Sequence, residues 1–312
     1  MDKLLIVGVD TIAGGNLAAW LAPRYQIVGL SLQGPLSIAG CETAACDAGS
    51  ADVPRQWVAS ERPGRIVYCG PGAVSTWSPS PAQPRSEAVH VAGAWARAAK
   101  EFGCQFTLIS SDAVFTGPWM FHREGGVCNC ESPAARILKM IEDEVVEACP
   151  ETLLVRTNVY GWSPLSGTSG LVEQVLHAAE EAEPLSLDCM RHATPILATD
   201  FAEVLERAWH HNLQGLHHLG GGERVNPFRF ACLLADQFGL PMSSFDAVET
   251  PLERRREFGA GETSLQNRKI RKALDVALPL VREGLARLYE QHVSGYRDRF
   301  GSLEPVLAEK VA

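Results

Sequence analysis

The chain has 312 residues, of which 46% are hydrophobic, and its formal net charge is −9. A chain of this length can bury a large core, in one large domain or two unequal ones. The negative charge, without a long basic run, argues against nucleic acid or an anionic membrane as a partner. Because no run of about 18 apolar residues occurs, we expect no membrane-spanning helix.

The first residues and the cysteines both favour a cytoplasmic protein. Met1 to Lys3 lead directly into a predicted strand, so we expect no signal peptide. The nine cysteines are an odd number, and several lie in apolar stretches, which suits reduced thiols better than a disulfide framework. Cys128 and Cys130 form a C-x-C pair, but neither a second pair nor a histidine cluster accompanies them. We therefore predict no metal site.

A glycine-rich turn follows the first predicted strand. Lys3–Val7 is an apolar, β-branched run that ends at Gly8, and a helix is predicted over Asn16–Ala22. Such a turn brings backbone N–H groups and a helix N-terminus together, which suits a pyrophosphate. A tight turn without a ligand is the alternative. The predicted dinucleotide contacts in this turn are Gly8, Thr11, Ile12 and Gly14.

The next two strands extend this predicted cofactor site. Gln26–Leu30 is followed by Ser31, at the position where an Asp or Glu commonly binds the ribose of NAD. No arginine stands beside Ser31 to favour a 2′-phosphate, so the choice between NAD and NADP stays open. Arg65–Cys69 is the third strand, and the small residues after it leave room for a cofactor. The predicted contacts here are Ser31, Cys69, Gly70 and Pro71.

The order of the remaining elements predicts the fold class. A helix over Ala88–Phe102 and a buried strand over Phe106–Ile109 continue the β-α alternation, which implies parallel pairing with right-handed crossovers. We predict an α/β fold with a Rossmann-type doubly wound parallel sheet and a smaller C-terminal α/β substrate lobe. The cofactor domain is predicted over 1–160, the lobe mainly over 161–300 and a tail over 301–312. Further predictions are a strand at 215–219 returning to the main sheet, a helix over 201–209 capped by Asp200, and a helix over 278–289.

Six segments carry a family resemblance. They are the glycine turn at 8–14, ISSDAVFTG at 109–117, LLVRTNVYG at 153–161, ATPILATDFAEVL at 193–205, GLHHLGGGERVNPFRFACLLADQFGL at 215–240 and TSLQNRKIRKAL at 263–274. Through these segments the chain resembles the dTDP-4-dehydrorhamnose reductase family, a branch of the extended short-chain dehydrogenases. That family also includes the regulatory subunit of methionine adenosyltransferase.

The resemblance implies a catalytic Ser or Thr, a Tyr and a Lys. Ser111 matches the hydroxyl and Lys139 matches the lysine, which in relatives also holds the nicotinamide ribose. The tyrosine position, four residues before Lys139, is occupied by Ala135. The missing phenol is the proton donor, and a general acid of this kind contributes about 10²–10⁴ in rate. We therefore expect impaired reduction of a keto sugar.

Other positions also depart from the family pattern. Thr11 replaces the middle glycine of the turn, and Ala113 replaces a tyrosine that relatives carry after Asp112. Arg136 cannot act as an acid because a guanidinium stays protonated. Candidate substitutes for the proton donor are Tyr68, Tyr160, His122 and Cys128, although packing roles are favoured for both tyrosines.

The resemblance also suggests further ligand contacts. Asp47 stands where relatives place an acidic residue near the adenine, with a solvated loop carboxylate as the equal alternative. The loop over 163–170 would close over a sugar nucleotide. Arg254 to Arg256 would face its diphosphate, or form a surface basic patch.

Three functions remain open from the sequence. The first is a reductase-like protein that binds NAD or NADP and, as a further candidate, a nucleotide-sugar-like ligand. The second is a non-catalytic regulatory or binding subunit like that of methionine adenosyltransferase. The third is an active reductase with a relocated proton donor. A homodimer and a partner protein both stay open.

Overall fold

A parallel sheet forms the centre of the fold in the computed structural model, which describes residues 2–47, 52–78, 84–165, 170–251, 253–254 and 257–301. Its seven strands run in the order β11-β7-β6-β5-β1-β2-β4, and every neighbouring pair is parallel. The strands are β1 (Lys3–Val7), β2 (Gln26–Ser31), β4 (Glu42–Ala45), β5 (Arg65–Tyr68), β6 (Gln105–Ser111), β7 (Leu153–Thr157) and β11 (Gly215–His218). The predicted Rossmann-type α/β fold is confirmed.

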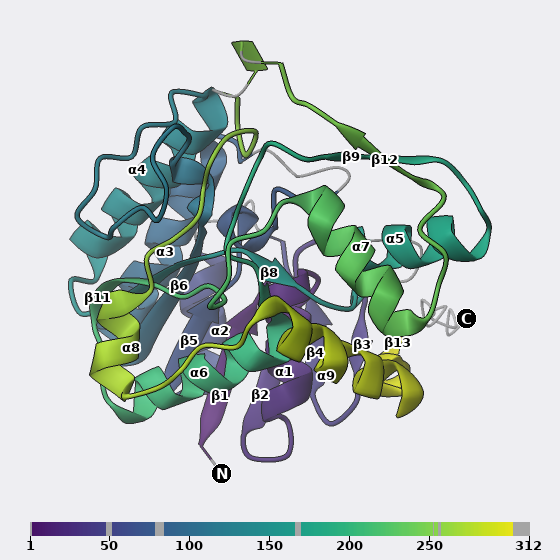
Figure 1. The fold of residues 1–312 in the computed structure, drawn as a ribbon. Helices are drawn as coiled ribbons and strands as arrows, with labels where there is room; N and C mark the ends of the chain where they lie inside the picture. Colours follow the sequence, from purple (N-terminus) through teal and green to yellow (C-terminus); the bar gives the residue numbers. More distant parts are fainter. Residues whose placement is uncertain are drawn as a thin grey trace, which may run out of the picture.

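Helices cover both faces of this sheet (Figure 1). One face carries α1 (Ile12–Leu21), α6 (Ala198–His210) and α8 (Arg268–Leu274), and the other carries α2 (Val53–Glu61), α3 (Glu87–Glu101) and α4 (Pro133–Ala148). Two apolar clusters result, with Leu17 and Phe201 in the first and Trp95 and Leu138 in the second. Burial on both sides explains why the central strands are almost continuously apolar.

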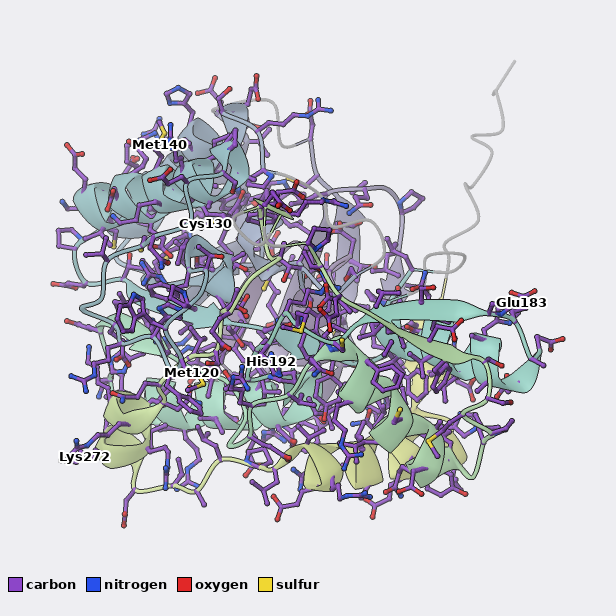
Figure 2. The ribbon with its side chains drawn as sticks, turned by 45° about the horizontal axis from the view of Figure 1, so that its top comes forward. Met120, Cys130, Met140, Glu183, His192 and Lys272 are labelled. Atoms are coloured by element: carbon purple, nitrogen blue, oxygen red, sulfur yellow. The ribbon has the colours of Figure 1, made fainter. Side chains whose placement is uncertain are left out.

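A smaller lobe packs beyond the carboxyl ends of the strands. It contains α5 (Leu171–Glu180), α7 (Pro227–Phe238), α9 (Val281–Val293) and the parallel pair β9 (Leu185–Asp188) and β12 (Phe245–Val248). Trp162, Phe230 and Leu288 are buried in its core. Glu183, labelled in Figure 2, lies at the outer end of the lobe. Because α6, β11 and α8 lie on the main sheet although they follow residue 160, the chain crosses between the two regions more than once.

Two short strand pairs connect distant segments of the chain. β8 (Val159–Tyr160) pairs in parallel with β10 (Ile196–Leu197). β3 (Ser37–Ile38) pairs in antiparallel orientation with β13 (Phe300–Gly301), so the last described residues return to the N-terminal half. No helix in the described ranges has the length and apolar character that crossing a membrane requires.

Two local predictions about helix starts were wrong. Helix α6 begins at Ala198 after the N-cap residue Leu197, so Asp200 is not the cap. Asp200 lies in the first turn of α6 and forms an ion pair with Arg287 instead. The helix predicted from Leu278 begins at Val281, because Pro279 disfavours helical geometry in the residue before it.

Candidate functional site

The predicted cofactor residues lie along one edge of the sheet. Gly8 follows β1, Ser31 ends β2, Asp47 lies beyond β4, Cys69 follows β5 and Ser111 ends β6. These five strands are neighbours and run in parallel, so their carboxyl ends share one edge. This edge is where doubly wound sheets bind their ligands. The residues are thus gathered in one region, while their contacts with a ligand stay a prediction.

Glycine is required at two positions of the β1–α1 turn. Gly8 has a φ of +87°, and a Cβ on it would lie 1.9 Å from the carbonyl oxygen of Cys69. A Cβ on Gly14 would lie 2.2 Å from the carbonyl oxygen of Gly8. Strand β5 and the start of α1 therefore approach the turn more closely than any side chain permits. Gly70 and Pro71 continue from β5 into a short 3-10 turn beside this contact.

Thr11 caps the helix that would receive a pyrophosphate. Its Oγ1 accepts a hydrogen bond from the N–H of Gly14 at 3.0 Å and donates one to the carbonyl of Gly8 at 2.8 Å. Within the described chain, the N–H groups of Ile12 and Ala13 meet no protein acceptor. Because Ala13 is fully buried, the N–H of the partly exposed Ile12 is the donor that remains for an anion at the positive end of α1, and the turn fits a dinucleotide despite the threonine.

Asp10 is a residue that the sequence interpretation missed. It is only 5% exposed, and its Oδ1 accepts a hydrogen bond from the N–H of Leu32 at 2.8 Å. This contact places a carboxylate from the β1–α1 turn at the end of β2, beside Ser31. Burial raises the pKa of Asp10, while the hydrogen bond from the N–H of Leu32 partly opposes this effect.

Ser111 is held in a buried polar group at the end of β6. Its Oγ accepts a hydrogen bond from the N–H of Ala113 at 3.1 Å and lies 3.3 Å from Oδ1 of Asp112. Oδ2 of Asp112 accepts from Asn158 at 3.1 Å and from Thr263 at 2.7 Å. Burial raises the pKa of Asp112 to about 6 although these donors lower it. The hydroxyl is therefore fixed by three segments of the chain.

Helix α4 carries the two other predicted catalytic positions. It packs against β6 and the turn that follows Ser111. Ala135 is 2% exposed on the inner face of α4. Lys139 forms an ion pair with Asp143 one turn further on, and its side chain is 42% exposed. In this conformation the lysine is directed along the helix surface to Asp143.

The four candidate substitutes for the proton donor have other roles. Tyr68 and Tyr160 are buried in apolar clusters, and burial raises the pKa of both phenols. His122 stacks on Phe115 with ring centroids 4.4 Å apart, and burial lowers its pKa. Sγ of Cys128 accepts a hydrogen bond from Arg156 at 3.2 Å. None of these groups forms a hydrogen bond with Ser111 within the described residues.

A buried ion pair beneath the site was also missed. Arg156 on β7 and Glu142 on α4 are joined at 2.6 Å, with side chains only 2% and 3% exposed. Nε of Arg156 donates to Oε1 of Glu142 at 2.8 Å, and the hydroxyl of Ser110 donates to the same oxygen at 2.7 Å. A charged residue inside the apolar run LLVRT was the one available sign that a buried partner must exist.

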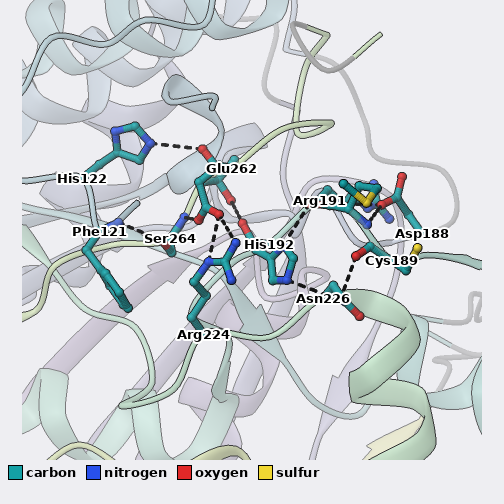
Figure 3. A network of polar contacts seen from close by, with 12 residues as sticks. Phe121, His122, Asp188, Cys189, Arg191, His192, Arg224, Asn226, Glu262 and Ser264 are labelled. Carbon is teal, nitrogen blue, oxygen red and sulfur yellow. Dashed lines mark hydrogen bonds and ion pairs between the residues drawn. The ribbon is translucent and has the colours of Figure 1, made fainter. Parts of the chain in front are cut away.

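A polar network joins the main sheet to the lobe beside this site (Figure 3). The carbonyl oxygen of Glu262 faces Nε2 of His122 at 3.1 Å, and its carboxylate accepts from Nε of Arg224 at 2.8 Å. The N–H of Thr263 donates to the carbonyl of His192 at 2.8 Å. Since Thr263 also contacts Asp112, the network holds the Ser111 region in register with the lobe.

Two ligand predictions fall partly outside the described residues. Arg254 is exposed and forms an ion pair with Glu257 at 3.0 Å, as expected for a residue of a surface basic patch. Arg255 and Arg256 lie outside the described ranges. The loop predicted over 163–170 is described only up to Leu165 and from Gly170. In the described part of the chain, no disulfide joins the cysteines, and no group of three or more His, Cys, Asp or Glu side chains could hold a metal ion.

Comparisons with known proteins agree with this architecture. The family model for the RmlD substrate binding domain matches residues 2–294. Methionine adenosyltransferase 2 subunit beta of Danio rerio is 27% identical over 238 residues, which cover 72% of this chain and 70% of the relative.

Solved structures share the fold at lower identity. A dTDP-4-dehydrorhamnose reductase of Bacillus anthracis, solved with NADP, is 19% identical with a TM-score of 0.76, over 93% of this chain and 98% of that one. The Bordetella bronchiseptica enzyme WbmG, solved with NAD and UDP, is 13% identical with a TM-score of 0.73, over 96% and 98%.

Proposed function

Because the chain belongs to the RmlD substrate binding domain family, we propose that it binds NAD or NADP at the carboxyl edge of its sheet, with keto-sugar reduction impaired. A nucleotide-sugar-like molecule is the second proposed ligand, by analogy with the UDP in WbmG. The proposal rests on two observations taken together, one at the glycine turn and one on α4. The cofactor turn keeps its tight glycines and the accessible N–H of Ile12, whereas the proton-donor position is the buried Ala135.

Each residue has a definite part in this proposal. The N–H of Ile12 would bind the pyrophosphate, and Ser111 would hold the carbonyl oxygen of a substrate. The bound nicotinamide would supply the hydride. Lys139 would have to leave Asp143 to reach the nicotinamide ribose. Ala135 could not donate a proton to the carbonyl oxygen. The substrate would therefore bind, but its reduction would be slow.

Calorimetric titration with NAD⁺ and NADP⁺ tests the cofactor part of this proposal, and Thr11→Gly sharpens it. Removing the threonine frees the N–H of Gly14 for phosphate, so we expect dinucleotide binding to tighten by about two- to tenfold. Replacing an N-cap threonine by glycine costs a few tenths of a kcal/mol, so the thermal midpoint should hardly fall. Binding of neither dinucleotide at millimolar concentration, by wild type or variant, would reject the cofactor claim.

A second candidate function is that of a protein subunit. The loop after β6 exposes Trp119 (73%), Met120 (59%) and Val127 (84%), and a hollow of about 580 Å³ lies among them. Exposed apolar patches of this kind mark interaction surfaces. The similarity to a methionine adenosyltransferase subunit supports a partner of that class.

Size-exclusion chromatography with the catalytic methionine adenosyltransferase of the same source organism tests this second candidate. We expect a stable complex with the wild type and loss of it in Trp119→Ser with Val127→Ser. Replacing the exposed Met242 by Ser, on the lobe, is the matched control and should leave the complex intact. Absence of any wild-type complex at micromolar concentration would reject the subunit function.

A further inference from the structure

Asp10 lies where a Rossmann sheet discriminates between its two nicotinamide cofactors. Its carboxylate accepts a hydrogen bond from the N–H of Leu32, the first residue after β2, at 2.8 Å. The end of the second strand is the position at which an acidic side chain binds the hydroxyls of the adenine ribose. In this chain that strand ends in Ser31, so the acid comes from the glycine turn instead.

The surroundings of Asp10 strengthen this interpretation. Asp10 forms no ion pair within the described residues, so no neighbouring cation neutralises its charge there. The sequence contains no Lys or Arg between Arg24 and Arg55, a stretch that includes all of β2 and β4. A 2′-phosphate at this edge would therefore meet a carboxylate and no local cation.

We propose that Asp10 makes this protein selective for NAD over NADP by taking the ribose-binding role that Ser31 cannot fill. The inference rests on the proposed dinucleotide site and assigns its specificity. A carboxylate accepts hydrogen bonds from the 2′ and 3′ hydroxyls of a ribose, which Ser31 alone would do less strongly. The same carboxylate repels a 2′-phosphate, so one side chain favours NAD and disfavours NADP.

Dissociation constants of NAD⁺ and NADP⁺, measured by calorimetry, test this proposal in the full-length protein. We expect the wild type to bind NAD⁺ at least about tenfold more tightly than NADP⁺, from loss of the ribose hydrogen bonds and like-charge repulsion. Asp10→Asn keeps an oxygen for the N–H of Leu32 and removes the charge. This variant should weaken NAD⁺, strengthen NADP⁺ and bring the two constants within about threefold.

Three further variants keep the test decisive. Glu42→Gln removes a negative charge from the exposed first residue of β4, away from the carboxyl edge of the sheet, and should leave the preference unchanged. Asp47→Asn tests the rival carboxylate at that edge: if it relaxes the preference, the selectivity belongs to Asp47 and the assignment to Asp10 is wrong. Leu32→Arg leaves Asp10 in place and adds a cation beside it, so NADP⁺ should bind more tightly even if Asp10→Asn does not fold.

The outcomes separate this inference from the proposed function. A wild type that binds both cofactors equally, or NADP⁺ more tightly, overturns the role of Asp10 and leaves the dinucleotide site standing. A wild type that binds neither at millimolar concentration removes the dinucleotide site itself.

Discussion

Glu142→Ala is expected to lower the free energy of unfolding by about 3–5 kcal/mol, the cost of leaving a buried charge without its partner. Arg156 is 2% exposed, and its guanidinium lies 2.6 Å from Glu142 and 5.1 Å from the Phe115 ring centroid. Removal of the carboxylate also leaves the hydroxyl of Ser110 without its acceptor. Because whole domains are stable by only about 5–15 kcal/mol, this single change should shift the urea midpoint strongly.

The neighbouring residue provides a matched control for Glu142. Asp143 is on the same helix, its side chain is 67% exposed, and it pairs with Lys139 on the surface. Asp143→Ala should change stability by no more than about 0.5 kcal/mol. Replacing the whole pair, with Glu142→Leu and Arg156→Met together, should restore most of the lost stability. A loss below about 1 kcal/mol in Glu142→Ala would contradict the buried-charge account.

Ala135→Tyr is expected to raise reductase activity on dTDP-4-dehydrorhamnose by about 10²–10⁴, the usual contribution of a general acid. The new phenol would stand four residues before Lys139, on the same face of α4. Lys139 would lower the pKa of the phenol once it leaves Asp143. Oxidation of NADH and NADPH, followed by absorbance, measures the gain.

Two controls separate the effect of the phenol hydroxyl from the effects of the aromatic ring and of overpacking. Ala135→Phe adds the same ring without the hydroxyl, so it should give no gain. Because Ala135 is buried, a large side chain can cost about 1–3 kcal/mol by overpacking, and thermal unfolding of both variants must be measured. If Ala135→Tyr folds, binds the cofactor and stays inactive, absence of the phenol alone does not account for the proposed impairment.

Most strands of the main sheet could be predicted from the sequence because their signal is local, whereas the short β4 was not predicted. Runs such as Lys3–Val7 and Phe106–Ile109 are largely apolar and bounded by turns, and their alternation with helices implies parallel order. Helix starts were harder, as Asp200 shows. An acidic residue before an apolar run resembles a cap, but its ion pair with Arg287 depends on a helix 87 residues away.

The residues of the candidate site differ in the same way: some have a local signal in the sequence, and others depend on distant contacts. The glycines could be proposed from their place directly after the first strand, and Ser111 and Ala135 from the family resemblance, because each of these signals lies within one short segment. Asp10 could not, because its proposed role depends on a hydrogen bond from the N–H of a residue 22 positions later. The partner of Arg156 was likewise hidden, since a glutamate on a helix carries no local sign of burial. The pairing of Lys139 with Asp143 follows i,i+4 spacing and was within reach of the sequence.

Nicotinamide fluorescence of NADH tests the retained cofactor site and the missing proton donor in one measurement. NADH is titrated with the wild-type protein, and dTDP-4-dehydrorhamnose is then added to the saturated complex. We predict a saturable change on binding, followed by a signal that stays constant after the keto sugar is added. Absence of a binding signal at millimolar protein would contradict the cofactor site. Decay of the signal at a typical enzymatic rate, about 1–10³ s⁻¹, would contradict the proposed impairment of keto-sugar reduction.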